Sequence, residues 1–245
     1  MNLLTLLLRG VTITATIALV AAAPGRTEPM RALGLEDRRD WQAVGRVNSA
    51  GFRVKRGCSG ALIAPDLVLT AAHCVTGTLA GSDWHFVAGW DRGSFVAHRI
   101  AADVHVHPRY TRTTGPAQRQ YDVAVMRLDG PIAPETVAPL DLDAAPERKP
   151  FDTATLLGYH NRRPHVLNAH DACPLLSRGE VWLFGCEVIS GNSGGPVIIH
   201  RNSQVVIAGV ITARAAGGDQ AMVVPVDLWV RRKWREAQDR AREQN

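Results

Sequence analysis

Short hydrophobic runs separated by turn-forming residues make up most of the chain beyond residue 43. The runs occupy residues 43–47, 57–63, 67–70, 85–88, 95–106, 123–128, 153–159, 181–186, 196–200, 205–212 and 221–226. Most of them are too short for a helix, and Gly, Pro, Asn or Asp residues stand between many of them. Short strands with frequent turns and almost no helical periodicity favour an all-β sandwich or barrel.

Helical periodicity occurs only at the C-terminal end, from Asp227 to about Arg242. The apolar positions there fall on one face of a helix: Val230, Trp234, Ala237 and Ala241. Asp227 is a suitable N-cap, because its carboxylate can accept a hydrogen bond from a free N–H group of the first turn. The pattern therefore predicts a β domain that ends in one helix.

The first 42 residues differ from the rest of the chain. Residues 3–8 and 11–20 are largely apolar and are followed by three alanines at 21–23, which is typical of a secretory signal peptide. An uncleaved N-terminal anchor is the alternative. Residues 23–42 are charged and show little periodicity. We expect a signal peptide over 1–22, a linker or propeptide over 23–42 and one domain over 43–245, in a secreted or periplasmic protein.

The composition is that of a globular protein. Among 245 residues, 46% are hydrophobic and 21% are charged, and the formal net charge is +5. Most of the excess positive charge lies in the C-terminal tail, so the body of the protein offers no basic stripe to a nucleic acid. We expect no nucleic-acid partner, no membrane association once the signal peptide is removed, and a monomer.

The chain has four cysteines, all beyond the predicted signal peptide: Cys58, Cys74, Cys173 and Cys186. An even number in an exported protein indicates two disulfides, and three connectivities are possible. Pairing neighbours in the sequence, Cys58 with Cys74 and Cys173 with Cys186, is the simplest. Four buried thiols are the alternative if the protein is not exported.

A serine among glycines, Ser193 in Gly191-Asn192-Ser193-Gly194-Gly195-Pro196, is the first candidate for chemistry. Small neighbours allow a substrate carbonyl to approach the hydroxyl and tolerate unusual backbone angles. The N–H groups of Gly191 and Ser193 could form an oxyanion hole, which stabilises the negative oxygen of acyl transfer. A glycine-rich turn between two strands is the alternative interpretation of this hexapeptide.

A serine nucleophile needs a base, and the base needs an acid that orients it. The candidate base is His73, which follows a predicted strand and has small neighbours. The candidate acid is Asp122, which opens the apolar strand 123–128 and could therefore be partly buried. Taken singly, each could be an ordinary surface or turn residue.

Four strings in this order resemble the chymotrypsin/trypsin family of serine proteases: Cys58–Ile63, Leu69–Cys74, Asp122–Val125 and Gly191–Pro196. The resemblance implies two six-stranded antiparallel β-barrels with a cleft between them and a C-terminal α-helix. It implies a secreted serine endopeptidase that hydrolyses peptide bonds of protein or peptide substrates through an acyl-enzyme, with no cofactor and no metal. Ser193 would be the nucleophile, His73 the general base and acid, and Asp122 the orienting carboxylate.

The sequence departs from the trypsin pattern at two places. Asn192 stands where trypsin-like enzymes have an aspartate that pairs with a new N-terminus, and here the chain is more similar to the bacterial branch that includes the glutamyl endopeptidases. The specificity pocket is expected to involve Glu187, Thr212 and Arg214. Glu187 would favour Arg or Lys substrates, and this is the preference that we expect. Arg214 could instead favour acidic substrates or plug the pocket. Glu187 and Arg214 could also pair with each other, or both could be ordinary surface charges.

Three alternatives remain from other classes. A catalytically silent, protease-like binding protein is one, although no member of the triad is missing. An α/β-hydrolase esterase is another, because Gly191–Gly195 also fits Gly-x-Ser-x-Gly; however, the residues after Pro196 favour a strand rather than the required helix. The third is a metal site, from His105 and His107 or from His165, His170 and Asp171, but neither set is a full ligand set at metal-site spacing.

Overall fold

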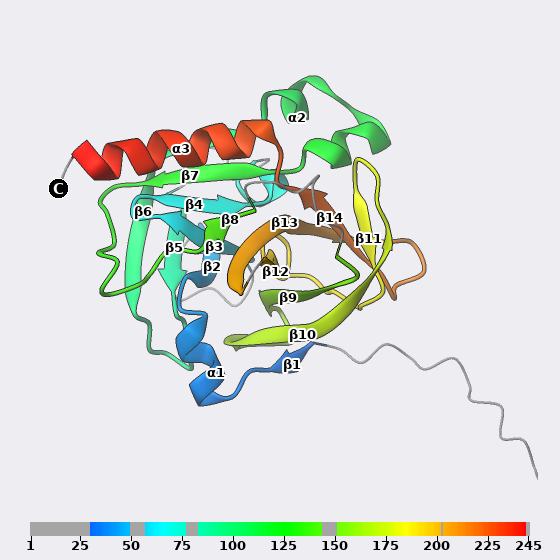
Figure 1. Cartoon of the computed structure of the whole chain (residues 1–245), viewed down its shortest axis with the longest axis horizontal. Coiled ribbons are helices and arrows are strands. Elements are labelled where there is room, and N and C mark those ends of the chain that lie inside the picture. The colour runs from blue at the N-terminus through cyan, green and yellow to red at the C-terminus, as the bar shows by residue number, and fades with distance from the viewer. Residues whose placement is uncertain (1–29, 50–56, 77–82, 144–150, 202, 244–245) are drawn as a thin grey trace, which may run out of the picture.

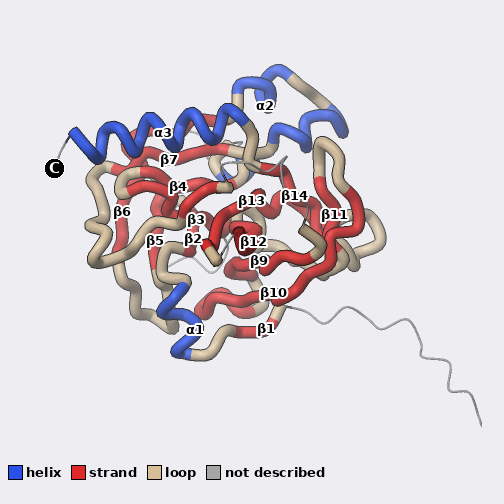
Figure 2. The backbone as a smooth tube through the Cα atoms, in the orientation of Figure 1, coloured by secondary structure: helices blue, strands red, loops and turns tan. Residues whose placement is uncertain are grey.

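Figure 1 shows the computed structural model of the chain, which describes residues 30–49, 57–76, 83–143, 151–201 and 203–243. The predicted signal peptide over 1–22 lies outside the described residues. No helix among the described residues is long and apolar enough to cross a membrane. Strands are the predominant secondary structure of the described chain, and the helices lie at its periphery (Figure 2).

The first half of the protein is a closed six-stranded antiparallel barrel with the order β2-β3-β4-β7-β6-β5. Its strands are β2 (Val44–Asn48), β3 (Cys58–Ala64), β4 (Leu67–Thr70), β5 (His85–Ala88), β6 (Ala97–Val106) and β7 (Ala124–Leu128). Fully buried side chains such as Leu69, Phe86 and Met126 fill the interior. Burial of each such side chain contributes roughly 1.5–3 kcal/mol, so these positions hold the barrel together.

The second half is a second six-stranded barrel, closed by the pairing of β9 with both β10 and β12. Its strands are β9 (Thr153–His160), β10 (Arg163–Ser177), β11 (Trp182–Phe184), β12 (Pro196–Arg201), β13 (Gln204–Arg214) and β14 (Ala221–Pro225). Two short strands join it, β1 (Arg31–Ala32) along β10 and β8 (Asp141–Leu142) along β13. The expectation of two six-stranded barrels is confirmed.

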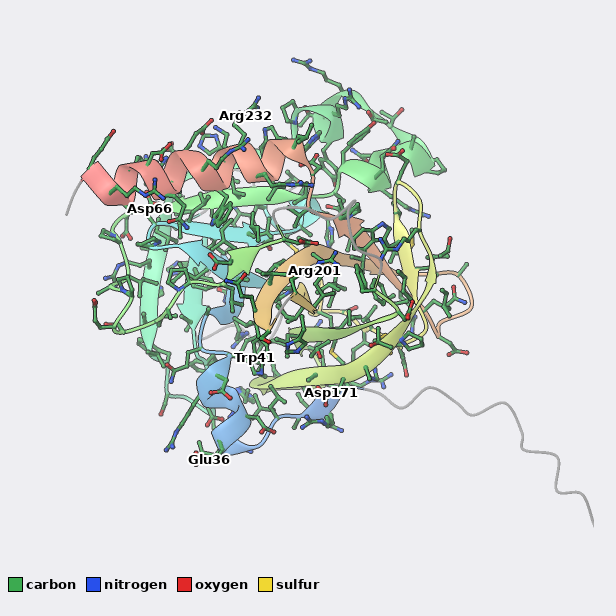
Figure 3. All side chains as sticks on the ribbon, in the orientation of Figure 1. Glu36, Trp41, Asp66, Asp171, Arg201 and Arg232 are labelled. Atoms are coloured by element: carbon green, nitrogen blue, oxygen red, sulfur yellow. A yellow bond between two sulfur atoms is a disulfide. The ribbon has the colours of Figure 1, made fainter. Side chains whose placement is uncertain are left out.

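The expected C-terminal helix is α3 (Leu228–Glu243), which packs across the first barrel (Figure 1). The indole N–H of Trp234 donates to the carbonyl of Ile63 at 2.8 Å. Arg240 donates to both carboxylate oxygens of Asp66, which Figure 3 shows below the helix. Although α3 follows the second barrel in the sequence, it therefore packs against the first barrel.

Short helices add to this picture where the sequence showed little helical periodicity. They are α1 (Leu35–Asp40), α2 (Pro108–Arg112) and the 3₁₀ segments η2 (Ala72–Cys74) and η4 (Gly115–Tyr121). Helices of one or two turns are too short to display an amphipathic period, and α1 buries none of its own residues. The prediction that only the C-terminal end is helical is therefore wrong for these segments.

The segment that precedes the first barrel packs against both halves of the protein. Met30 and Leu33 are almost fully buried, Met30 in the core of the second barrel and Leu33 in the larger core cluster. Leu33 N–H donates to the carbonyl of Leu167 at 3.0 Å, and Arg163 donates to the carbonyl of Met30 at 3.2 Å. Residues 30–42 are thus part of the packed structure, and the domain boundary at residue 43 stays a prediction.

Candidate active site

Two neighbouring strands of the first barrel bring His73 and Asp122 together. Thr70 at the end of β4 pairs with Ala124 at the start of β7, so the residues just beyond these strand ends meet. Asp122 accepts two hydrogen bonds from His73, one from ring Nδ1 at 2.7 Å and one from the backbone N–H at 2.9 Å. The carboxylate is largely buried and fixes both the ring and its tautomer, because Nδ1 carries the proton that it donates. Nε2 is left as the nitrogen that can accept a proton.

Two disulfides flank the candidate residues, and each joins neighbours in the sequence. Cys58 bonds Cys74, directly after His73, and Cys173 bonds Cys186, upstream of Ser193. Potential ligand atoms of Cys58, His73 and Cys74 lie within 4.8 Å of one another. The two sulfurs are bonded to each other, so they are not thiolates, and this group does not fit a metal ion.

Among the described residues, none of the histidines considered for a metal site belongs to a cluster of three potential ligands. β6 ends at Val106, and His107 begins the α2 turn instead of continuing the strand beside His105. His107 is buried, and its Nε2 lies 3.1 Å from a carboxylate oxygen of Asp227, next to α3. His170 donates from Nε2 to the carbonyl of Glu187 at 3.0 Å, and burial lowers the pKa of this ring. His107 therefore pairs with Asp227 beside the first barrel, and His170 forms a hydrogen bond within the second barrel.

The loop that carries Ser193 lies between β11 and β12 and depends on glycine at two positions. Gly191 has φ +103° and Gly194 has φ +83°, a region that other residues rarely adopt. A Cβ atom at Gly191 would lie 2.8 Å from Cα of His160. At Gly194 a Cβ atom would overlap the carbonyl oxygen of Ser59. The loop therefore packs tightly against both barrels.

This conformation leaves two N–H groups available beside the serine. Within the described part of the chain, the backbone N–H groups of Gly191 and Ser193 donate no hydrogen bond. Asn192 N–H, between them, donates to the carbonyl of Ile189 at 3.0 Å. Two free donors next to a serine hydroxyl form the arrangement that an oxyanion hole needs.

The hydroxyl of Ser193 donates to the carbonyl of Thr212 at 3.3 Å, and in the described structure it forms no hydrogen bond with His73. The two residues are nevertheless connected through the first barrel. Ser193 C=O accepts from the N–H of Ser59 at 2.7 Å, and the adjacent Cys58 is bonded to Cys74, the neighbour of His73. Hydrogen bonds between catalytic residues are often long without substrate, and rotation about Cα–Cβ of Ser193 redirects its hydroxyl.

A cleft of about 910 Å³ opens beside Ser193. Its lining residues come from the second barrel and its loops: Asn161, Arg162, Val188, Ile189, Ser190, Asn192, Ser193, Ile211, Ala213 and Arg214. Two of these carry a positive charge, and none of the described lining residues is an acid. The cleft is therefore more suitable for a neutral or acidic side chain than for a basic one.

The three expected pocket residues occupy different places. Thr212 is buried, and its hydroxyl donates to the carbonyl of Met222 at 3.3 Å. Glu187 does not line the cleft, and its carboxylate lies 4.0 Å from the guanidinium of Arg214. The Glu187 side chain is 20% exposed and that of Arg214 is 51% exposed. Arg214 thus lines the cleft, whereas the carboxylate of Glu187 lies next to the guanidinium of Arg214.

Asn192 is the residue whose neutral amide departs from the trypsin pattern, and both ends of that amide are bonded. Its oxygen accepts from the N–H of Ile189 at 2.9 Å, and its nitrogen donates to the carbonyl of Tyr159 at 3.1 Å.

Ser59 contacts the same loop through its hydroxyl, and the sequence alone did not indicate this role. Its only signal was its place in the string Cys58–Ile63.

Comparisons with known proteins agree with this geometry. A family model described as Trypsin matches residues 35–231. A protein named Trypsin from Saccharopolyspora erythraea is 30% identical over 170 residues, which cover 59% of this chain and 71% of that protein. The solved structure of a Glu endopeptidase in complex with MPD is similar with a TM-score of 0.69 at 20% identity. That similarity covers 87% of this chain and 97% of the other, and it concerns the fold alone.

Proposed function

Because the chain belongs to the trypsin family of serine endopeptidases, we propose that it hydrolyses peptide bonds through Ser193, His73 and Asp122. The observation that carries this proposal is the double hydrogen bond from His73 to Asp122, in a protein where Ser193 lies in a glycine loop with two free N–H donors. The same contact supports His73 as the base, since it leaves Nε2 to accept a proton.

The reaction proceeds in two halves. As Ser193 Oγ attacks the scissile carbonyl carbon, its proton passes to His73 Nε2, and the carbonyl oxygen becomes an oxyanion facing the N–H groups of Gly191 and Ser193. Asp122 stabilises the imidazolium, which then protonates the leaving amine as the C–N bond breaks. A water molecule, deprotonated by His73, hydrolyses the resulting acyl-enzyme and regenerates the serine.

Substrate preference is proposed to follow the residues around Glu187, Thr212 and Arg214. The 4.0 Å contact between Glu187 and Arg214 supports a pocket whose carboxylate is covered by a guanidinium. The similar structure is that of a Glu endopeptidase. We therefore infer a preference for acidic over basic residues before the cleaved bond, in contrast to the preference that Glu187 alone would produce.

The site of action is proposed to be outside the cytoplasm. The two disulfides indicate an oxidising compartment, in agreement with the signal peptide predicted over residues 1–22. Protein or peptide substrates follow from the family, and a monomer is the state that we propose.

A cleavage profile tests the proposal. The exported protein and its Ser193→Ala variant are incubated with a diverse peptide mixture, and the cut sites are read by mass spectrometry. Cuts made only by the parent protein, mostly after Glu or Asp, are expected. Cuts mostly after Lys or Arg would contradict the inferred preference, and no difference between the two proteins would favour the silent binding protein.

A further inference from the structure

Ser59 is a buried hydroxyl that joins the first barrel to the loop of Ser193. It has no exposed surface. Its Oγ donates to the carbonyl of Gly191 at 2.8 Å and accepts from the N–H of Tyr159 at 2.8 Å. One side chain of β3 therefore holds the nucleophile loop and strand β9 of the second barrel at the same time.

The Gly191 carbonyl is a point at which such a contact matters. Glycine adopts left-handed and right-handed conformations with similar ease, so local sterics alone do not fix the peptide planes on either side of Gly191. A hydrogen bond to its carbonyl fixes the plane of the 191–192 peptide. The N–H of Gly191 belongs to the preceding 190–191 peptide, whose carbonyl accepts from the N–H of Asn161 at 2.9 Å. With the two peptide planes held on either side, Gly191 keeps its φ of +103° and its N–H keeps one direction, which the proposed oxyanion hole requires.

The residues around the hydrogen bond from Ser59 to Gly191 are tightly packed. Gly158 lies against it, and a Cβ atom there would approach Ser59 Oγ to 3.1 Å and Asn192 Nδ2 to 3.2 Å. The backbone of Tyr159 bonds to both Ser59 and Asn192, since its N–H donates to Ser59 Oγ and its carbonyl accepts from the Asn192 amide. Ser59, Asn192 and the end of β9 form one hydrogen-bonded unit behind the loop.

The dipeptide Cys58-Ser59 also connects the two halves of the candidate site. Cys58 reaches Cys74 through the disulfide and so anchors the turn of His73, while Ser59 anchors the loop of Ser193 through its hydroxyl and its own N–H. Two adjacent residues of β3 are thus bonded to the two halves of the candidate site, Cys58 to the turn of His73 and Ser59 to the loop of Ser193.

We propose that Ser59 is a positioning residue that holds the Gly191 N–H toward the oxyanion through the Gly191 carbonyl. This role rests on the proposed function, because it requires that an oxyanion forms beside Ser193. The unit is built from neutral groups only, so the loop is held without a charged partner for Asn192. Ser59 itself does not contact the substrate.

The test compares Ser59→Ala with the matched control Tyr159→Phe in the exported protein. Tyr159 is also almost fully buried, and its hydroxyl donates to the carbonyl of Trp90 at 2.9 Å, away from the loop. Both variants lose one buried hydroxyl. Kinetics on a peptide from the cleavage profile are measured together with the binding of a peptide aldehyde, which forms an oxyanion with the enzyme, and of the corresponding cleavage product, which does not.

For Ser59→Ala we expect kcat to fall at least tenfold with KM little changed. Aldehyde affinity should fall by a similar factor, whereas product affinity should stay the same. Tyr159→Phe should change none of these values by more than about twofold. Equal behaviour of the two variants, or an equal loss of aldehyde and product affinity, would overturn the role of Ser59 while leaving the triad untouched. A parent protein that resembles its Ser193→Ala variant would instead refute the proposed function.

If Ser59→Ala does not fold, Ser59→Cys takes its place, because a thiol leaves no cavity, is only moderately larger than the hydroxyl, and is a weak donor. The same selective loss of kcat and aldehyde affinity is expected from it. Unchanged values in Ser59→Cys would contradict the proposal.

Discussion

At the scale of single residues, neutral groups hold the loop that carries Ser193. The amide of Asn192 satisfies its donor and its acceptor within the chain, and it is 1% exposed. A carboxylate at this position would lack the donor that Tyr159 C=O accepts from, and would place a charge where burial is costly. The loop therefore needs no ammonium partner in order to adopt its conformation.

The role of Asp122 is tested by Asp122→Asn. An amide keeps the size of the side chain but can donate to Nδ1 of His73, which favours the wrong tautomer of the imidazole. We expect kcat to fall by about 10⁴, as in the template reaction. Far-UV and near-UV circular dichroism should match those of the parent. A variant that keeps more than about a tenth of the parent rate would remove Asp122 from the mechanism.

The pocket contact is tested by Arg214→Ala. Without the guanidinium, Glu187 becomes available to a basic substrate side chain, and we expect cleavage after Lys or Arg to gain at least about tenfold relative to cleavage after Glu. Ion pairs as exposed as this one contribute little to stability, so the melting temperature should hardly change. The control is Arg214→Ala with Glu187→Gln, which should lose the gain. An unchanged preference in the single variant would show that Glu187 does not face the substrate.

At the scale of elements, one contact joins the start of α3 to the turn that precedes the loop of Asp122. Asp227 accepts from the N–H of Val230 at 2.9 Å, which caps the helix, and lies 3.1 Å from Nε2 of His107. Burial raises the pKa of the Asp227 carboxyl, but hydrogen bonds from His107 and from backbone N–H groups outweigh it. The pKa therefore lies below the ordinary value of 3.8.

This pKa predicts how stability depends on pH in Asp227→Asn. Asparagine caps helices about as well as aspartate, so the variant loses mainly the charge beside His107 and the helix N-terminus. We expect it to be less stable by about 1 kcal/mol at pH 6. Because the folded-state pKa is lowered, the charge contributes fully above the unfolded-state pKa and is lost as pH falls through the folded-state pKa. Denaturant unfolding should show the difference shrinking below about pH 4; a constant difference down to pH 2 would contradict this.

The elements were predictable to the extent that turns separate them. Runs such as 67–70 and 85–88 match β4 and β5, since the turn residues Pro65 and Asp66 precede the first and Gly89 follows the second. The longest strand, β10, was missed, because polar residues and a register irregularity between His170 and Cys173 break its alternation. Its partners, β9 and β11, determine its conformation, and a single stretch of sequence does not reveal them.

At the scale of the whole molecule, the candidate site depends on residues far apart in the sequence. The positions of His73, Asp122 and Ser193 could be proposed from their motifs, because each needs a particular local setting. The contacts that hold these three residues in place could not be proposed from the sequence. That Ser59 supports Gly191, or that Arg214 covers Glu187, follows from the way two barrels meet and from side-chain directions in the cleft.

The segment before the first barrel also acts at this scale, and its removal is a test. Met30 and Leu33 are 2% and 4% exposed and lie in different core clusters. Their combined burial contributes roughly 3–6 kcal/mol. We expect a chain that begins at Gln42 to melt at least about 6 °C below one that begins at Met30. Equal melting temperatures by calorimetry would show that residues 30–41 do not contribute to the fold.

The central claim is that His73 and Asp122 activate Ser193 as a nucleophile. The most direct measurement is labelling with a fluorophosphonate, which forms a covalent bond with an activated serine, followed by intact-mass analysis and peptide mapping. The account predicts one adduct per chain, on Ser193, that is absent in Ser193→Ala and forms far more slowly in His73→Ala. No adduct on the folded parent protein, or an adduct on another residue, would contradict the account.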